Sequence, residues 1–537
     1  MNRRRLAILF GTVLALAGLV AASGFGAAGS VPVVIEGQTI RVGEGGDLQE
    51  ALDKARPGDT ILLAPGATFV GNYVLPRKDG AQDVTVRTAT SSRTSPGTRI
   101  GPEASGSLAR LRSPDTRPAL VTAPGAHHWR LQDLEFLANR NGAGEIIRLG
   151  VGGQTADEVP RELVFERLLI RGDETSGQRR GIALNSASTT IRDSHISGIG
   201  ARGQDSQAIC GWNGPGPFLI ENNYLEAAAE NIMFGGADPS APGLVPSDII
   251  IRGNHMSKPP EWRDGPRAVW VVKNLLELKN ARRVLIENNV LERTWRSGQT
   301  GNAILFTVRN QDGRAPWSVV EDVTFQYNIV RHAGGGFSIL GRDYTHPSEQ
   351  TNRLRIRHNL FYDIDGKKWG GSGRFVLIGA APRDIVFDHN TVLQSNAVLY
   401  IHGLAKDPSN VVPQFSFTNN VVRHGDYGII GERGGGMGRP SIERYFPGGV
   451  VERNVLAGGN PKHYSGENYF PSVDELLANF VDPAGEDYRL RDGSGFRKRA
   501  TDGSSLGADV PEILRRTANV INRAAVAAWR ASESESK

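Results

Sequence analysis

The fold is decided by a stretch that reads Val284-Leu285-Ile286-Glu287-Asn288-Asn289-Val290, because close copies of it recur along the chain. Residues 218–225 read Phe-Leu-Ile-Glu-Asn-Asn-Tyr-Leu, and residues 415–421 read Phe-Ser-Phe-Thr-Asn-Asn-Val. In each copy, apolar and polar residues alternate up to an Asn or Asp, and a second apolar run follows. Alternation with a period of two predicts β-strands rather than helices.

The Asn or Asp of each copy recurs at a regular interval. It falls at Asp193, Asn223, Asn254, Asn289, Asn328, Asn359, Asn390, Asn420 and Asn454, with gaps of 30, 31, 35, 39, 31, 31, 30 and 34 residues. A period of about 20–50 residues with occasional insertions predicts a solenoid. Asn suits a fixed corner because it tolerates left-handed backbone and its side chain bonds to nearby backbone. A β-sandwich or propeller would need hairpin turns every ~8–12 residues, which are missing.

This pattern resembles the right-handed parallel β-helix superfamily, which includes pectate-lyase-like enzymes, over roughly residues 32–510. The resemblance implies an all-β solenoid and is compatible with many chemistries. We therefore expect an export signal or anchor at residues 1–30, a β-helix domain at 31–510, and a C-terminal helix with a polar tail at 511–537.

Short helices are predicted at both ends of the solenoid. Apolar residues at 48, 51, 52 and 55 predict an amphipathic helix that covers the N-terminal end of the core. At the other end, Asp509, Pro511 and Glu512 are typical of a helix start. We expect this second helix to lie over the last coil through one face, formed by Leu514, Ala518, Ile521, Ala525 and Trp529.

The N-terminus is typical of an exported protein. Three arginines at 3–5 precede an uncharged stretch at 6–22 and small residues through Ser30. This order predicts a signal peptide ending at about residue 22–30 and a secreted or periplasmic protein, with an uncleaved anchor as the alternative.

Charge and cysteine content narrow the partners. Removing residues 1–30, which carry three Arg and no acidic residue, leaves 59 basic against 57 acidic side chains. Because basic and acidic side chains nearly balance, the protein has no overall positive electrostatic potential that would attract nucleic acid or an anionic membrane. We expect a monomer that binds polysaccharide. The single cysteine, Cys210, excludes an intrachain disulfide and a cysteine-based metal cluster.

The densest group of polar residues lies at 270–280. Each coil carries a strand whose outward residues stack about 4.8 Å apart, so that they form a ribbon for an extended ligand. Alternation places Leu276 and Leu278 inside and Glu277 and Lys279 outside. The two longest gaps contain insertions at 257–265 and 309–317, which flank this strand, and insertions in repeats often mark the binding face.

Within this ribbon we expect a groove that binds an acidic polysaccharide. Its predicted lining is Glu277, Lys279, Arg309 and Trp212, with Lys273 and Arg342 at its margins. Asn274 and Asn231 are further candidates for substrate binding. Trp212 offers a flat face on which a sugar ring can pack.

β-Elimination requires a base for the proton next to a uronate carboxylate, and cations that stabilise the enolate. Lys279 and Arg309 are the predicted base and stabiliser, and Glu277 is a Ca²⁺ ligand or tunes the lysine pKa. Asp238 is a second candidate Ca²⁺ ligand, since Ca²⁺ prefers oxygen donors. The competing interpretation is that these charges are ordinary solvated residues of a strand.

The motifs leave the chemistry open. The Asn-Thr-Asp, Asp-Asp and Gly-His-Gly set of polygalacturonase-type hydrolases is absent, as is the Trp-x-Asp-His pattern of typical pectate lyases. Lyases of this fold that use Lys and Arg with calcium-binding Glu residues are more similar, but their Glu-x-Glu is Glu277-Leu278-Lys279 here. The leading hypothesis is a polysaccharide lyase. The alternatives are a non-catalytic glycan-binding or adhesive module and a glycoside hydrolase.

Overall fold

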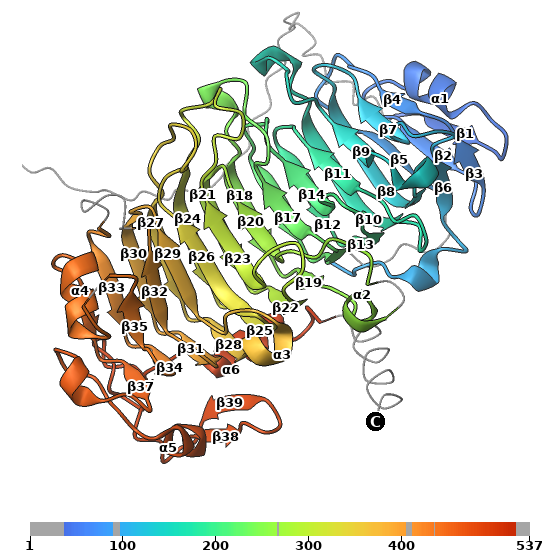
Figure 1. The fold of residues 1–537 in the computed structure, drawn as a ribbon. Helices are drawn as coiled ribbons and strands as arrows, with labels where there is room; N and C mark the ends of the chain where they lie inside the picture. Colours follow the sequence, from blue (N-terminus) through green and yellow to red (C-terminus); the bar gives the residue numbers. More distant parts are fainter. Residues whose placement is uncertain (1–36, 90–96, 266–267, 404–410, 434, 522–537) are drawn as a thin grey trace, which may run out of the picture. The chain divides into compact units, whose positions relative to one another are not determined.

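The computed structural model describes residues 37–89, 97–265, 268–403, 411–433 and 435–521. The predicted export signal at 1–30 lies outside these residues. Within them, three rows of parallel strands wind into a right-handed parallel β-helix, which confirms the predicted fold (Figure 1). No helix in these ranges is long and apolar enough to cross a membrane.

Each coil runs through the rows in the order 1, 2, 3, and every strand pairs with the equivalent strands of the coils before and after it. Row 1 consists of β1 (Thr39–Val42), β2 (Thr60–Leu63), β5 (Val84–Thr88), β8 (His127–Leu137), β10 (Arg161–Arg171), β12 (Thr189–Arg192), β15 (Phe218–Glu221), β18 (Ser247–Arg252), β21 (Ala281–Glu287), β24 (Val320–Gln326), β27 (Asn352–Arg357), β30 (Arg383–Asp388), β33 (Phe415–Thr418) and β36 (Val450–Glu452).

Row 2 shares the long strands β8 and β10 with row 1, so that the two rows form one sheet. Its other strands are β3 (Thr68–Val70), β6 (Ala109–Arg112), β13 (His195–Ile199), β16 (Tyr224–Ala227), β19 (His255–Ser257), β22 (Val290–Thr294), β25 (Ile329–Ala333), β28 (Leu360–Ile364), β31 (Thr391–Gln394), β34 (Val421–Arg423) and β37 (Val455–Ala457).

Row 3 is a separate sheet. Its strands are β4 (Tyr73–Leu75), β7 (Leu120–Thr122), β9 (Glu145–Leu149), β11 (Arg180–Leu184), β14 (Gln207–Gly211), β17 (Glu230–Phe234), β20 (Leu276–Leu278), β23 (Asn302–Thr307), β26 (Gly335–Leu340), β29 (Val376–Gly379), β32 (Leu399–His402) and β35 (Ile429–Gly431). Inward residues of the three rows stack into one apolar core, which includes the fully buried Ile232, Leu276 and Ile304 of row 3.

The recurring Asn forms a ladder at the corner between rows 1 and 2, as predicted. Asn254 Oδ1 accepts hydrogen bonds from both the backbone N and Nδ2 of Asn223, each at 3.0 Å. The same pair of bonds repeats through Asn289, Asn328, Asn359, Asn390, Asn420 and Asn454 and ends at Asn468. Each buried amide therefore connects successive coils without leaving its polar atoms unsatisfied.

The left-handed residue is not the ladder Asn but the residue before it. The backbone φ is 52° at Asn222, 58° at Asn288 and 50° at His358. Asp193 belongs to this left-handed position too, with φ 55°, and the ladder begins one residue later at Ser194. Asn therefore occurs at this position because its side chain forms hydrogen bonds to the neighbouring coils. The first residue of the predicted series, Asp193, lies one residue before the ladder position, which is Ser194.

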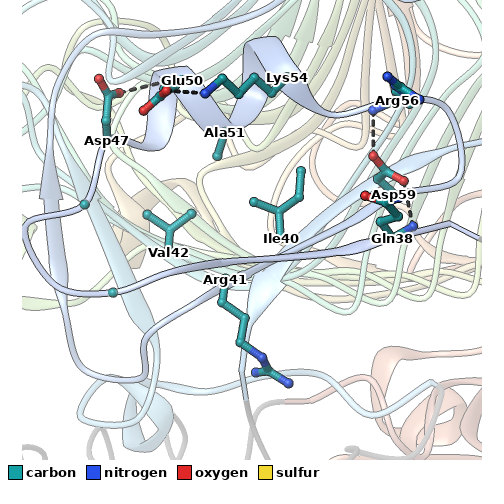
Figure 2. A pocket seen from close by; sticks show the side chains of 12 residues that line it. Gln38, Ile40, Arg41, Val42, Asp47, Glu50, Ala51, Lys54, Arg56 and Asp59 are labelled. Atoms are coloured by element: carbon teal, nitrogen blue, oxygen red, sulfur yellow. Dashed lines mark hydrogen bonds and ion pairs between the residues drawn. The ribbon is translucent and has the colours of Figure 1, made fainter.

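The N-terminal cap confirms the prediction. Helix α1 (Leu48–Lys54) starts at Asp47, whose side chain accepts a hydrogen bond from Glu50 N, and it buries Leu48, Ala51 and Leu52. A cavity of about 640 Å³ lies between α1 and β1 (Figure 2). Three of its charged side chains have partners within the cap: Lys54 pairs with Glu50, and Asp59 accepts from the backbone N of Gln38 and Arg56. We assign this cavity to the cap.

The C-terminal part packs along the side of the solenoid instead of over the last coil. After β37 it forms α5 (Val473–Ala478), the hairpin β38 (Phe480–Asp482) and β39 (Asp487–Leu490), and α6 (Val510–Thr517). Val510 and Ile513 of α6 share an apolar cluster with outward residues of row 2, among them Val290, Ile329 and Leu360. The backbone O of Val520 accepts a bond from Arg99, which also binds Asn222.

This packing corrects the predicted face of the last helix. The buried residues of α6 are Val510, Ile513 and Thr517, whereas Leu514 is 41% exposed and Ala518 is exposed. Ala525 and Trp529 lie outside the described residues. The prediction was wrong because the surface that α6 covers is the flank of row 2, which the sequence pattern of the helix alone does not identify.

The remaining helices lie in turns. Helices α2 (Glu261–Asp264) and α3 (Gly366–Trp369) belong to the turns that lead from row 2 to row 3, and α4 (Arg439–Tyr445) follows β35.

Candidate functional site

The outer face of row 3 carries the predicted pair Glu277 and Lys279. In the register of β17 and β20, Met233 lies opposite Glu277, and Leu276 and Leu278 are fully buried in the core. The outward direction of both charged residues is thus confirmed. Lys279 lies beside Gly235, which has φ 112° and where a Cβ would approach Lys279 Cβ to 2.6 Å. A side chain at Gly235 would therefore displace the lysine.

The next coil carries Arg309, the predicted stabiliser. Leu305 lies opposite Glu277, and Thr307 therefore follows opposite Lys279. Arg309 comes after the end of β23 and binds Asp343, with Nη1 3.1 Å from Oδ1. Arg309 has the same parity as Leu305 and Thr307, as the alternation predicts, but it lies two residues past the position opposite Lys279. It already has a carboxylate partner in Asp343.

Lys279 is held in its charged form. Its Nζ lies 3.6 Å from Glu277 Oε1, and its side chain is only 15% exposed. Burial lowers the pKa of Lys279, but the charges of Glu277, Glu230 and Asp205 outweigh burial and raise that pKa overall. A base requires a lowered lysine pKa. The raised pKa favours a fixed positive charge at Lys279 over the base that the sequence predicted, and the role of this residue stays a prediction.

Glu230, at the start of β17, is a candidate for proton transfer, a role that the sequence did not suggest. It is fully buried, its Oε2 accepts a bond of 2.9 Å from Gln207, and its Oε1 lies 3.9 Å from Lys273 Nζ. Burial, together with the charges of Glu277 and Asp205, raises the pKa of Glu230 to about 8. A carboxyl group that titrates near neutrality can release or take up a proton during a reaction.

One signal in the sequence pointed to Glu230. The residue is the one charge within the apolar stretch Ala227–Ala229 and Ile232–Phe234, and carboxylates are rarely buried without a specific partner. The Gly- and Pro-rich segments close by favour instead a turn residue or a Ca²⁺ ligand when the sequence is taken alone.

Lys273 and Asn274 directly precede β20. Lys273 contacts Glu230, and Asn274 contacts Glu277. Lys273 Nζ lies 2.6 Å from Asp205 Oδ2, so this lysine bridges Asp205 and Glu230. Asn274 is fully buried and its Nδ2 donates to Glu277 Oε2 at 3.3 Å. The structure therefore brings Lys273, Asn274 and Glu277 together as predicted. Lys273 and Asn274, however, bind carboxyl groups of the protein itself.

Two arginines continue this strip of polar residues on the coils that precede β17. Arg180 Nε donates to Gln207 Oε1, and its guanidinium lies 5.3 Å from the ring centre of Trp212. Arg148 of β9 pairs with Glu145 and keeps 39% of its side chain exposed. Trp212 is half-buried and shares one coil with Gln207. We call the polar and aromatic residues on this outer face of row 3 the row 3 strip: Arg148, Arg180, Gln207, Trp212, Glu230, Lys273, Asn274, Glu277 and Lys279.

Asn231 is a structural residue. It is fully buried, and its Nδ2 donates to the backbone O of Leu225 and Ser257. These bonds fix the corner between β16 and β17. The predicted role of Asn231 in substrate binding does not fit this position.

The residues predicted to hold Ca²⁺ do not fit that ion. Glu277 faces the ammonium of Lys279, which repels a cation, and its other oxygen accepts a hydrogen bond from the amide of Asn274. Asp238 Oδ2 accepts from the backbone N of Asp312 and Arg314, so it anchors the loop after β23. Within the described ranges, no group of three or more His, Cys, Asp or Glu residues is arranged to hold a metal.

Arg342 lies in a separate cavity, at the turn from row 3 to row 1. This cavity measures about 510 Å³ and is lined by Arg282, Trp317, Glu321, Arg342 and Arg383, among others. Glu321 is already paired with Arg282 and Arg353. Arg342 is therefore not at the margin of the row 3 strip but in a second, cation-rich surface.

Comparison with known proteins supports the fold. No protein-family model and no curated protein sequence matches the chain. The alginate lyase AlyGC of family PL6 is 14% identical, with a TM-score of 0.51 over 80% of this chain and 53% of that one, so that the alignment spans about half of its length. An α-1,3-glucanase of family GH87 from Streptomyces thermodiastaticus is 14% identical, with a TM-score of 0.48 over 83% of this chain and 71% of its own. The similarity to AlyGC supports a parallel β-helix fold. It does not identify the reaction, which has to be argued from the residues of the site.

Proposed function

We propose that the chain is an extracytoplasmic enzyme that cleaves an acidic polysaccharide by β-elimination on the row 3 strip. The observation that carries this proposal is the combination of Glu230, a buried carboxyl group with a pKa raised to about 8, and the charged Lys279 on the next strand. One group can exchange a proton near neutral pH, and the other supplies a fixed positive charge.

Two parts of β-elimination then have a candidate residue. Lys279 neutralises the uronate carboxylate while negative charge develops on it, which is worth more in a water-poor site than in solution. Glu230, when ionised, accepts the proton from the carbon next to the carboxylate. As the carbon–carbon double bond forms, the glycosidic C–O bond breaks and its leaving oxygen takes a proton from water. Arg148 and Trp212 bind neighbouring sugar units by charge and by stacking.

A glycoside hydrolase is the second candidate, and the pair Glu230 and Glu277 favours it. The two glutamates lie on neighbouring strands, and the charge of Glu277 contributes to the raised pKa of Glu230. Two carboxyl groups, one kept protonated and one ionised, are the machinery of glycoside hydrolysis.

The test is an incubation of the mature protein with alginate, pectate and glycosaminoglycans. A lyase releases unsaturated products that absorb in the ultraviolet, at the same rate at which new reducing ends form. Reducing ends without ultraviolet absorbance would replace the lyase with the hydrolase. Binding to a polymer without either product would leave a glycan-binding module.

A further inference from the structure

Lys258 is a fully buried lysine directly after β19. Its Nζ donates to the backbone carbonyl oxygens of three consecutive alanines, at 2.8 Å (Ala227), 2.9 Å (Ala228) and 2.9 Å (Ala229). Two further oxygens complete the surroundings, the backbone O of Asn274 at 3.1 Å and Oδ1 of Asn231 at 3.3 Å. We call these five oxygens the oxygen cage.

The cage has the chemistry of a cation site. An ammonium has three N–H donors, whereas five oxygens without formal charge converge on this nitrogen. Backbone carbonyl and amide oxygens directed at one point are the donors by which proteins replace the hydration shell of a cation. Three successive carbonyl dipoles would repel one another if nothing positive lay between them.

Apolar side chains close the site off from water. Ala228 packs in a cluster with Trp262, Trp270, Val272 and Trp295, all of which are buried. The loop between β19 and β20 contributes Lys258 itself and three members of this cluster. The longest part of this coil therefore serves to enclose the ammonium.

The cage residues surround Glu230. Ala227–Ala229 precede Glu230 and Asn231 follows it, while Asn274 lies across from it at the start of the next strand. The charged groups that face Glu230 from the other elements are Lys273, Asp205 and Glu277. Burial lowers the pKa of Lys258 to about 7, and the negative charge of Glu230 opposes this lowering.

We propose that Lys258 is a built-in cation: its ammonium occupies the oxygen cage and thereby positions Glu230 and Asn274 in the row 3 strip. Lys258 is a positioning residue, since it acts through the corner before β17. The effect on activity rests on the proposed function, but the occupation of the cage by a cation does not.

The first experiment compares two variants of the full-length mature protein. Lys258→Ala opens the cage, and Lys258→Met fills it with an uncharged chain of similar length. We expect the melting temperature of Lys258→Ala to rise in potassium chloride and in ethylammonium chloride, but not in tetramethylammonium chloride, whose cation is too large. Wild type and Lys258→Met should respond equally little to all three salts. An Lys258→Ala variant that is indifferent to all three salts would overturn the proposal.

A second measurement needs no variant to fold. In wild-type protein labelled with ¹⁵N-lysine, a buried ammonium bonded to carbonyl oxygens should give an Nζ signal protected from exchange at a pH below the lysine pKa of about 7. The absence of any protected ammonium would contradict the built-in cation.

The activity profile tests the positioning role. Loss of the positive charge in Lys258→Met disfavours ionised Glu230, so the pH at which turnover rises should move upward. An unshifted profile would overturn the positioning of Glu230 by Lys258. An inactive wild type with a salt-responsive Lys258→Ala would instead refute the proposed function and leave the cation site standing.

Discussion

At the scale of single residues, the environment of each charge decides what it can do. Glu277 and Lys279 were predictable from strand alternation, because the period of two fixes which side chains point outward. Their pKa directions were not predictable, because they depend on Glu230 and Asp205, which come from other coils. The same cross-coil contacts raise the pKa of Lys279 and that of Glu230, which is why we propose a fixed charge at the first and the proton acceptor at the second.

The raised pKa of Glu230 predicts a pH-dependent stability. Because its folded-state pKa of about 8 exceeds its ordinary value of 4.5, the folded state binds more protons between these two pH values. Its contribution to the free energy of unfolding therefore falls as the pH rises from 4.5 to about 8. Glu230→Gln removes this fall, so the variant should gain stability over wild type as the pH rises. Urea unfolding at several pH values in this window measures the difference.

The matched control is Glu443→Gln on α4, whose side chain is exposed. It should follow wild type at each pH. Parallel curves for wild type and Glu230→Gln would show that Glu230 is ionised throughout and would remove it from the proton transfer.

The ladder makes a second prediction. Asn328→Leu deletes bonds to both neighbouring coils and leaves the backbone N of Asn289 without its acceptor. We expect a loss of about 1–3 kcal/mol in the free energy of unfolding by urea. Asn468→Leu, at the half-buried end of the ladder, is the control and should cost less. If the two variants lose the same free energy of unfolding, the interior side-chain hydrogen bonds contribute no stability beyond the preference of Asn for a turn.

At the scale of elements, the cap helix α1 was predictable because its buried face is defined by the apolar spacing within its own seven residues. For helix α6, the start could be predicted from the sequence, but the buried face could not. Its start at Asp509 is local, since the Asp509 side chain caps Glu512 N. Its buried face depends on row 2, which lies far away in the sequence.

Neighbouring residues of α6 test this packing. Ile513 is fully buried and Leu514 is 41% exposed. Ile513→Asp should place a charge against row 2, cost about 3 kcal/mol or more, and open the C-terminal segment to limited proteolysis. Leu514→Asp should leave both stability and proteolysis unchanged. The reverse order would restore the helix face that we predicted from sequence.

At the scale of the whole molecule, the repeat fixes the solenoid because each coil contacts only its neighbours, so a local pattern propagates. The same property limits the prediction of a site, because coils differ in strand and loop length and the local pattern does not say which side chains meet across coils. The contacts of Glu230 with Lys273 and of Lys258 with three alanine carbonyls are of this kind.

The central claim is that the row 3 strip is the place of polysaccharide cleavage, with Lys279 as its fixed charge. The most direct measurement is the turnover of Lys279→Ala on the polymer that wild type cleaves, next to Lys367→Ala on α3, whose side chain is exposed. We predict that Lys279→Ala lowers turnover by about 10²–10³ without loss of melting temperature, since it removes a preorganised charge. Lys367→Ala should match wild type. A folded Lys279→Ala variant with normal turnover would contradict the account and place the reaction on another face.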